Sequence, residues 1–276
     1  MIEISKKIIS MFGRANAYFG LIKENDKILI GLSGGKDSLL LSTLLARHKK
    51  HAPYAFDFKA VTVDYGIGED FSYLQDYCAQ NEIPHEVYRT DIMAIMQEKR
   101  RGSSSFCSFC SRMRRGALYS KALSGGFNKL ALGHHLDDAV ESFFMNFSYN
   151  GALRSMPPLY RAHNGIVVIR PLIWLRERQM IDFVVTNAIQ TPRCNCPAIH
   201  DKPPHVREAT KMMLKKLEEQ NKELFVSLKA AFMNLHAQTF MDKQFLDCPS
   251  DDGAIGIPSD FPIDKTYHEE QREETV

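Results

Sequence analysis

A short glycine-containing loop has the residue types that bind phosphate groups. Its residues are Ser33, Gly34, Gly35, Lys36, Asp37 and Ser38. The loop follows an apolar run at 27–32 that predicts a buried strand, and an apolar helix is expected after it. Glycines allow the backbone to approach a ligand closely, and the N–H groups at the start of a helix attract anions. Lys36 adds positive charge, whereas Asp37 would repel phosphate unless it caps the helix or faces Mg²⁺.

The order of residues in this loop separates it from other phosphate-binding loops. A P-loop needs four residues between its first glycine and the Gly-Lys pair, and the dinucleotide fingerprint is also absent. The hexamer 33–38 instead resembles the signature of PP-loop ATP pyrophosphatases. That resemblance implies that ATP is split between its α and β phosphates and that AMP is transferred to a carbonyl-type oxygen. A strand-to-helix turn without a ligand is the alternative, and the lysine and two serines argue against it.

A second motif follows the predicted strand 129–133, and parallel strands end at the same edge of a sheet. Its residues are Gly133, His134, His135, Leu136, Asp137 and Asp138. It resembles the second PP-loop motif of tRNA-modifying enzymes, which implies that Gly133 and His134 contact the nucleotide. Asp137 and Asp138 would orient the substrate or hold Mg²⁺. The alternative is a pair of solvated acids at a helix N-terminus.

An acidic residue lies at a further strand end. Asp64 ends the predicted strand 56–64 and therefore falls at the same sheet edge as Ser33. The resemblance to PP-loop enzymes implies a catalytic or nucleotide-contacting acid at this position. The predicted catalytic residues are Lys36, Asp37, Asp64 and Asp138.

Two cysteines have the spacing of a metal or iron–sulfur site. Cys107 and Cys110 supply two thiolates, so further ligands must come from elsewhere, and Cys194 and Cys196 are the candidates. Three cysteines suggest a cluster with one open iron, whereas four suggest zinc or a closed cluster. A redox dithiol or two unconnected thiols are the alternatives. The two remaining cysteines are expected in a helix of the core (Cys78) and in the tail (Cys248).

A basic strip borders this cysteine pair. Its members are Lys99, Arg100, Arg101, Arg112, Arg114 and Arg115. The five arginines are predicted to bind the phosphates of RNA, and the alternative is that they balance thiolate charge. Phe106 and Phe109 add aromatic faces that could stack on bases, but packing in the core is favoured for both.

The elements that carry these motifs alternate between strands and helices. Strands are expected at 27–32, 56–64, 86–88, 129–133 and 166–169, and helices at 2–23, 37–48, 71–81, 93–99, 107–122, 137–146 and 176–188. This order predicts an α/β fold with a doubly wound parallel sheet and a C-terminal helical extension. The expected divisions are an N-terminal helical segment (1–26), a nucleotide-binding domain (27–190), a cysteine loop with C-terminal helices (191–240) and an acidic, flexible tail (241–276).

Charge is distributed unevenly over the 276 residues. Residues 250–276 carry a net charge of −6 and the preceding residues +8. A basic body suits a polyanionic partner, although an ordinary soluble surface is favoured on charge alone. No apolar run is long enough to span a bilayer, and residues 1–7 lack a signal-peptide core, so a cytoplasmic location without membrane contact is expected. In that compartment, clustered cysteines favour metal or redox chemistry over disulfides.

Four segments together resemble the tRNA 2-thiocytidine synthetase (TtcA) family of PP-loop ATP pyrophosphatases. They are Cys107 to Tyr119, Leu132 to His135, Met156 to Pro158 and Ile169 to Leu172, and the resemblance covers roughly residues 5–240. It implies an ATP-dependent tRNA sulfurtransferase that adenylates cytidine 32 of the anticodon loop and replaces its 2-oxygen with sulfur. The implied cofactors are ATP, Mg²⁺ and a [4Fe–4S] cluster held by three cysteines.

The same resemblance extends to the ligands and partners. It carries over directly to Cys107 and Cys110, but the third ligand departs from the family pattern. The family shows Cys-X-X-Cys where this chain has Cys194-Asn195-Cys196-Pro197, and Cys196 is favoured, with Cys194 in reserve. The implied partners are tRNA, a sulfur donor (a cysteine desulfurase persulfide or sulfide) and a second copy of the chain in a homodimer.

Three other functions fit the residues less well. Thiolation of another tRNA base, as by 2-thiouridine enzymes, is disfavoured because those relatives carry N-terminal zinc-finger cysteines and this chain has no cysteine before Cys78. Ligation of lysine to tRNA is disfavoured by the clustered cysteines. A non-catalytic iron–sulfur or zinc RNA-binding protein is disfavoured by the intact Lys36-Asp37 pair.

Overall fold

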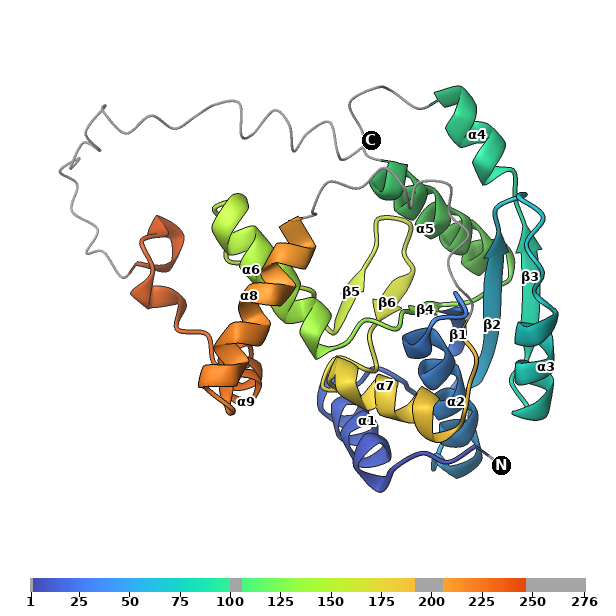
Figure 1. Cartoon of the computed structure of the whole chain (residues 1–276), viewed down its shortest axis with the longest axis horizontal. Helices are drawn as coiled ribbons and strands as arrows, with labels where there is room; N and C mark the ends of the chain where they lie inside the picture. Colours follow the sequence, from blue (N-terminus) through green and yellow to red (C-terminus); the bar gives the residue numbers. More distant parts are fainter. Residues whose placement is uncertain (1, 100–105, 192–205, 247–276) are drawn as a thin grey trace. The chain divides into compact units, whose positions relative to one another are not determined.

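A six-stranded sheet forms the centre of the protein (Figure 1). The computed structural model describes residues 2–99, 106–191 and 206–246. The sheet order is β3-β2-β1-β4-β6-β5, and every neighbouring pair is parallel except β5 and β6. The strands are β1 (Lys27–Gly31), β2 (Asp57–Asp64), β3 (His85–Arg89), β4 (Lys129–Ala131), β5 (Leu159–Arg161) and β6 (Val167–Ile169). The predicted doubly wound α/β sheet is confirmed.

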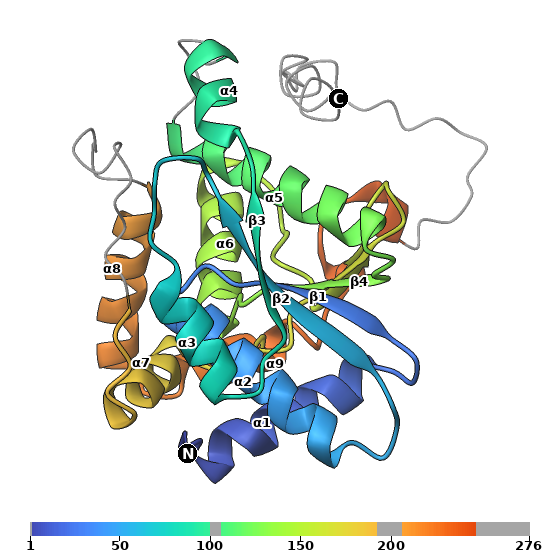
Figure 2. The same cartoon turned by 90° about the vertical axis from the view of Figure 1, so that its right-hand side faces the viewer.

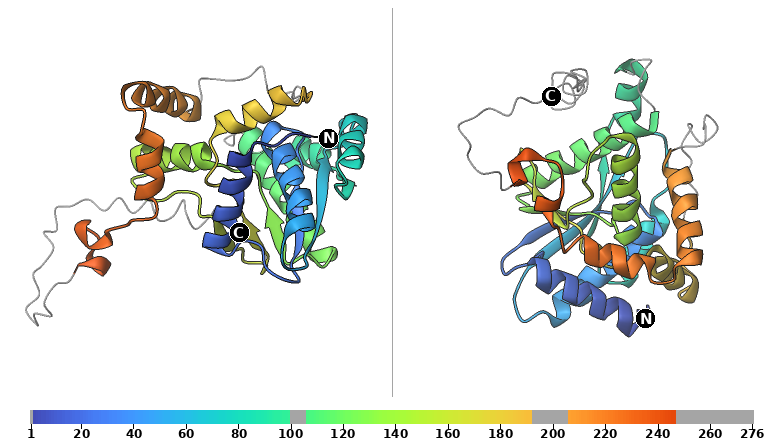
Figure 3. Two further views of the ribbon diagram at one scale, coloured as in Figure 1. Left: turned by 90° about the horizontal axis from the view of Figure 1, so that it is seen from below. Right: turned by 90° about the vertical axis from the view of Figure 1, so that its left-hand side faces the viewer.

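The helices cover both faces of this sheet. They are α1 (Lys6–Phe19), α2 (Lys36–His51), α3 (Ser72–Gln80), α4 (Ile92–Lys99), α5 (Phe106–Ser124), α6 (Leu136–Tyr149), α7 (Glu177–Thr186), α8 (Val206–Gln220) and α9 (Leu224–Ala231), followed by the short 3₁₀ turns η2 (Ala237–Thr239) and η3 (Lys243–Phe245). Figure 2 shows α5 on one face of the sheet and α1 and α2 on the other. Seen from below, α1 and α2 lie in front of the sheet (Figure 3).

Alternating side chains of the strands build two separate cores. Ile28 and Ile30 of β1 pack with the buried residues of α1, α2 and α7, whereas Leu29 packs with Leu118 and Ala122 of α5. Successive side chains of a strand point to opposite faces, so a strand buried on both sides is apolar throughout. Because α1 shares the first of these cores, the N-terminal segment belongs to the same folded unit as the sheet.

The expected elements were largely found, with one omission. β5 was missed, and it pairs antiparallel with β6 at the edge of the sheet. Its three residues include two exposed ones and follow Pro157 and Pro158, so neither length nor apolar pattern marks it as a strand. The expected helix at 2–23 is shorter, because Ser5 caps its start and Gly20 ends it in the left-handed conformation.

The chain divides into two compact units, residues 1–229 and 230–276. The first contains the sheet, its covering helices, α8 and most of α9. In the second, the described residues form the turns η2 and η3. None of the described helices is long and apolar enough to cross a membrane.

Candidate functional site

The loop between β1 and α2 presents unused backbone donors at the carboxyl edge of the sheet. Gly34 has a φ of 81°, a conformation that residues with a side chain rarely adopt. Gly35 is the N-cap of α2 and makes no side-chain cap, and within the described part of the chain nothing accepts a hydrogen bond from the amides of Gly34 and Gly35. The Ser38 hydroxyl donates to the Gly35 carbonyl at 3.0 Å and lies 3.2 Å from the Ser33 hydroxyl. The loop is thus braced internally while its amides remain open to an anion.

Gly133 brings the second motif against this loop. A Cβ atom at Gly133 would lie 3.2 Å from the Asp37 carbonyl carbon and 3.2 Å from the Ser38 nitrogen. A larger residue at this position would therefore have to push the end of β4 and the start of α2 apart by a few tenths of an ångström. β1 and β4 are neighbours from which the chain continues in opposite directions across the sheet, and such a switch point is where doubly wound sheets bind ligands.

Three carboxylates surround the buried side chain of His135. Its Nε2 lies 3.4 Å from Asp138 Oδ2 and 3.9 Å from Asp37 Oδ1, and its Nδ1 lies 3.6 Å from Asp137 Oδ2. Burial disfavours the charged ring, but the three acids outweigh it and raise the pKa of His135. Among the described residues, the buried Asp37 Oδ1 and His135 Nδ1 have no hydrogen-bond partner. Such orphaned atoms at a ligand site indicate a missing partner, for example an ion or a ligand.

Asp37 and Asp138, two of the predicted catalytic acids, differ in their contacts and in their position relative to a helix cap. Asp37 is not the helix cap allowed for in the sequence, because Gly35 takes that position, and its Oδ2 lies 3.3 Å from Lys36 Nζ. Burial raises the pKa of the Asp37 carboxyl. Asp138 Oδ2 accepts a hydrogen bond from the His135 backbone at 3.0 Å, so Asp138 caps α6 and also faces the site. The cap expected as the alternative at this motif is therefore present for Asp138, and its contact with substrate or Mg²⁺ stays a prediction.

His134 is held in one orientation by a buried arginine. Arg170 Nε donates to His134 Nδ1 at 3.2 Å, and the guanidinium also donates to the Pro157 carbonyl at 2.6 Å and lies over the Tyr160 ring. Because Nδ1 is the acceptor, the proton of the neutral imidazole is on Nε2. Burial, reinforced by the positive charge of Arg170, lowers the pKa of His134 to about 4. His134 is therefore a neutral hydrogen-bond donor at neutral pH.

We expect acid to destabilise the protein through His134. In the unfolded chain its pKa returns to roughly 6.5. The unfolded state then binds the proton more strongly than the folded state, so the free energy of unfolding falls as the pH drops from about 6.5 toward 4, by on the order of 3 kcal/mol at most. Urea unfolding of His134→Gln should show a clearly shallower loss of stability over this range. The exposed His163, replaced by glutamine, is the control and should keep the wild-type slope; equal slopes in all three proteins would contradict the assignment.

Asp64 ends β2, and the residue that follows it interacts with α5, the helix that carries three of the predicted RNA-binding arginines. Asp64 accepts a hydrogen bond from the Gly66 backbone at 2.8 Å, and the following residue, Tyr65, interacts with Arg114 and Cys110 of α5. Burial raises the pKa of Tyr65, and the nearby Arg114 partly opposes this shift. The first half of α5 therefore reaches the edge of the sheet at which the nucleotide loop lies.

The predicted RNA-binding arginines can be placed only in part. Arg112, Arg114 and Arg115 are exposed on α5, and Arg115 acts electrostatically on His134 and Arg170. Arg100 and Arg101 lie outside the described residues. Of the aromatic pair, Phe109 packs against the core beneath α5, as favoured from the sequence, and the side chain of Phe106 is outside the described part.

The predicted cluster ligands likewise fall mostly outside the described part of the chain. Cys194 and Cys196 lie in the gap between residues 191 and 206, and Cys107 is described only as part of the first turn of α5. Cys110 is half-buried on the next turn. Cys78 is buried in the core as expected, and burial raises its pKa to about 12. Across the described ranges, the side chains of His, Cys, Asp and Glu form no group of three or more arranged to hold a metal.

A layer of ion pairs behind the site was not foreseen. The N-cap and the first residue of α7 contact three other helices. Arg176 donates to Asp137 at 3.1 Å and pairs through both terminal nitrogens with Glu218 of α8, at 2.8 and 2.9 Å. Glu177 lies 3.2 Å from Lys36 and 2.5 Å from Lys211 of α8. The spacing between these partners in the sequence follows no period that a pattern search detects.

Helix α8 also contacts the capping acid of α6. Arg207 pairs with Asp138 and, at 2.8 Å, with Glu141. Figure 1 shows α8 lying across α6. Helix α8 therefore reaches Asp138 directly, Asp137 through Arg176 and Lys36 through Glu177. In the sequence, these lysines and arginines contribute only to the general positive charge of the residues before the acidic tail.

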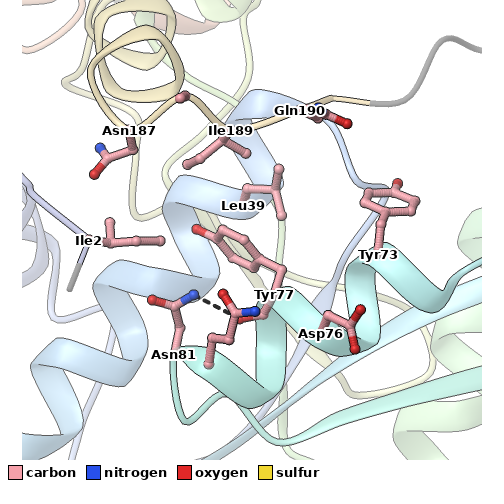
Figure 4. A pocket seen from close by; sticks show the side chains of 11 residues that line it. Ile2, Leu39, Tyr73, Asp76, Tyr77, Asn81, Asn187, Ile189 and Gln190 are labelled. Atoms are coloured by element: carbon pink, nitrogen blue, oxygen red, sulfur yellow. Dashed lines mark hydrogen bonds between the residues drawn. The ribbon is translucent and has the colours of Figure 1, made fainter.

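A pocket of about 490 Å³ lies apart from the loop at residues 33–38 and the motif at residues 133–138 (Figure 4). It is lined by Ile2, by Leu39 of α2, by residues of α3 including Tyr73 and Tyr77, and by the chain that follows α7. None of the predicted catalytic or nucleotide-binding residues lines it. Its size alone therefore does not make it the nucleotide site, which is defined by open amides and charges at the sheet edge.

Comparison with known proteins agrees with this geometry. Residues 3–191 match the family model of the PP-loop domain. A tRNA-cytidine(32) 2-sulfurtransferase from Geobacter sulfurreducens is 40% identical over 239 residues, which cover 86% of this chain and 93% of the relative. The enzyme of the same name from Geobacter metallireducens is 39% identical over 241 residues, covering 87% and 93%. Among solved structures, the U34-tRNA thiolase NcsA from Methanococcus maripaludis with its [4Fe-4S] cluster superposes with a TM-score of 0.64 at 21% identity, covering 81% of this chain and 76% of that one.

The family match and the fold define the chain as a PP-loop protein, and the loop at residues 33–38 lies between β1 and α2 of that domain. Within that class, its identity to relatives over most of both chains is decisive. The chain belongs to the tRNA-cytidine(32) 2-sulfurtransferase family.

Proposed function

We propose that this protein adenylates cytidine 32 in the anticodon loop of tRNA and replaces the 2-oxygen of that base with sulfur. The cytidine O2 attacks the α-phosphorus of ATP and pyrophosphate leaves; sulfur then attacks C2 and AMP leaves with the oxygen. The juxtaposition of the open-amide loop with Gly133 and His134 at the switch point supports this function most strongly. Family membership supplies the identity of the base.

The residues around the loop fit a triphosphate. The free amides of Gly34 and Gly35, the N-terminus of α2 and Lys36 would hold the departing pyrophosphate. His134 presents an Nε2 donor held in place by Arg170, which suits an oxygen of the nucleotide or the base. The acids Asp64 and Asp138 remain candidates for contacts with the substrate.

Magnesium would bind beside the same phosphates. Mg²⁺ in nucleotide sites is held by one or two carboxylates together with phosphate oxygens and waters. The orphaned Asp37 Oδ1 fits this role, and Asp138 Oδ2 faces the same imidazole. A bound ion would screen the repulsion between these carboxylates and the phosphates.

A [4Fe–4S] cluster would be held by Cys107, Cys110 and Cys196, with Cys194 as the alternative third ligand. When bound, the cluster would hold the sulfur delivered by the donor for its attack on C2. Cys110 fits, since it lies on α5 near Tyr65, at the end of the strand that carries Asp64. Exposed Arg112, Arg114 and Arg115 on that helix would hold the RNA backbone, together with Arg100 and Arg101.

The partners and location follow from the same chemistry. We propose tRNA as the substrate, a cysteine desulfurase persulfide or sulfide as the sulfur donor, a cytoplasmic location and assembly as a homodimer. Light scattering on the purified protein tests the dimer, and a monomeric mass would contradict it.

Anaerobically purified protein, incubated with tRNA, ATP, Mg²⁺ and sulfide, tests the function. We expect pyrophosphate release and a 2-thiocytidine detectable by mass spectrometry of the digested tRNA. A tRNA transcript with uridine at position 32 is the matched control and should stay unmodified. Thiolation of a uridine elsewhere would favour the 2-thiouridine alternative, and absence of both products would leave an RNA-binding protein. Iron and sulfide content of Cys194→Ala and Cys196→Ala identifies the third ligand.

A further inference from the structure

The lysine of the nucleotide loop already has an anionic partner from another helix. Lys36 Nζ lies 3.2 Å from Glu177 Oε1 and 3.3 Å from Asp37 Oδ2. Both partners are mostly shielded, with exposed side-chain fractions of 26% for Lys36 and 22% for Glu177. Asp37 belongs to the loop itself, whereas Glu177 is the first residue of α7 and comes from a distant part of the sequence.

Glu177 is in turn held by a second lysine. Lys211 of α8 lies 2.5 Å from Glu177 Oε2, so each carboxylate oxygen has its own ammonium group. The backbone N–H of Glu177 donates to Asp137 at 2.7 Å, which fixes the start of α7. Consequently Glu177 can give up Lys36 without becoming an unpaired charge in a shielded position, because Lys211 remains.

We propose that Glu177 is a resident counter-ion that competes with the polyphosphate of the nucleotide for Lys36, and that Lys211 sets the strength of this competition. This inference rests on the proposed ATP-dependent function and deepens it. A carboxylate this close to Lys36 opposes an incoming anion, whereas Lys211 weakens that opposition by sharing the charge. As pyrophosphate departs, Glu177 takes Lys36 back and so favours release of the product.

Substitutions of Glu177 and of Lys211 should change the affinity for ATP and pyrophosphate in opposite directions. Glu177→Gln removes the competing charge and keeps the shape, so ATP and inorganic pyrophosphate should bind roughly three- to tenfold more tightly. Lys211→Met leaves Glu177 with Lys36 alone, so both should bind more weakly, by roughly two- to fivefold given the exposure of Lys211. In the double variant the effect of Lys211 should disappear.

Calorimetric titration of the full-length variants with ATP, pyrophosphate and adenosine tests the proposal. Lys216→Met, an exposed lysine on the same helix, controls for loss of charge and should bind as the wild type does. Adenosine, which has no phosphate, should bind all variants equally. Weaker ATP binding by Glu177→Gln, or an equal shift with adenosine, would overturn the proposal and make Glu177 a structural residue. Wild-type protein that binds ATP but does not modify tRNA would instead refute the proposed function, and the competition between Glu177 and the polyphosphate for Lys36 would still hold.

Discussion

Replacing Gly133 with alanine should lower the rate of ATP-dependent pyrophosphate release by about 100-fold. The new Cβ would lie 3.2 Å from the Asp37 carbonyl carbon and the Ser38 nitrogen. Both are backbone atoms at the start of α2, so the clash cannot be relieved by rotating a side chain. The end of β4 and the nucleotide loop must then separate, and a small displacement of reacting groups is costly because catalysis depends on their alignment.

Gly13→Ala, the same substitution within a helix, is the control for Gly133→Ala. Gly13 lies in α1, and a Cβ there meets no atom within 4 Å. Gly13→Ala should keep full activity and stabilise the protein slightly, since alanine is the better helix former. Steady-state pyrophosphate release and urea unfolding on both variants separate loss of geometry from loss of fold. An active Gly133→Ala variant would show that the two motifs need not lie so close.

Local patterns in the sequence were sufficient to predict the sheet and the place of the two loops that form the candidate site. The buried strands are continuous apolar runs, and the residues that follow β1 and β4 have the glycines and acids of a phosphate site. Parallel strands end at one edge, so these loops had to converge there. The short edge strand β5 was missed because its residues are partly exposed and its hydrogen-bonding partner is defined only by the fold.

The charged layer behind the loops could not be inferred in this way. Arg176 joins Asp137 to Glu218. Asp137 lies about 40 residues before Arg176 in the sequence, and Glu218 lies about 40 residues after it. An ion pair between distant segments leaves no periodic signal, and each of its residues alone resembles an ordinary solvated charge. His134 presents the same difficulty, since its neutral state depends on burial and on the buried Arg170, which comes from another strand end.

Replacing Lys36 with methionine should reduce the rate constant for pyrophosphate release by roughly 10²- to 10³-fold. Methionine keeps most of the apolar stem and removes the ammonium group that faces the predicted pyrophosphate. Although burial works against its charge, Asp37 and Glu177 raise the pKa of Lys36, so the wild-type side chain is fully charged at neutral pH. Lys49→Met is the control on the same helix, because Lys49 pairs, among the residues that the structure describes, with the exposed Asp57, and its activity should be unchanged.

The loss in Lys36→Met should exceed that of a single contact, because two carboxylates still face the phosphates: Asp37 has lost its lysine partner, and Glu177 keeps Lys211. Combining Lys36→Met with Glu177→Gln removes one of them. We expect the double variant to recover part of the affinity for ATP while the rate of pyrophosphate release stays low, since the affinity reflects total charge and the rate requires a donor at the leaving group. Recovery of both quantities together would mean that Lys36 acts only as a neutralising charge, and a Lys36→Met rate within threefold of wild type would remove it from the catalytic step altogether.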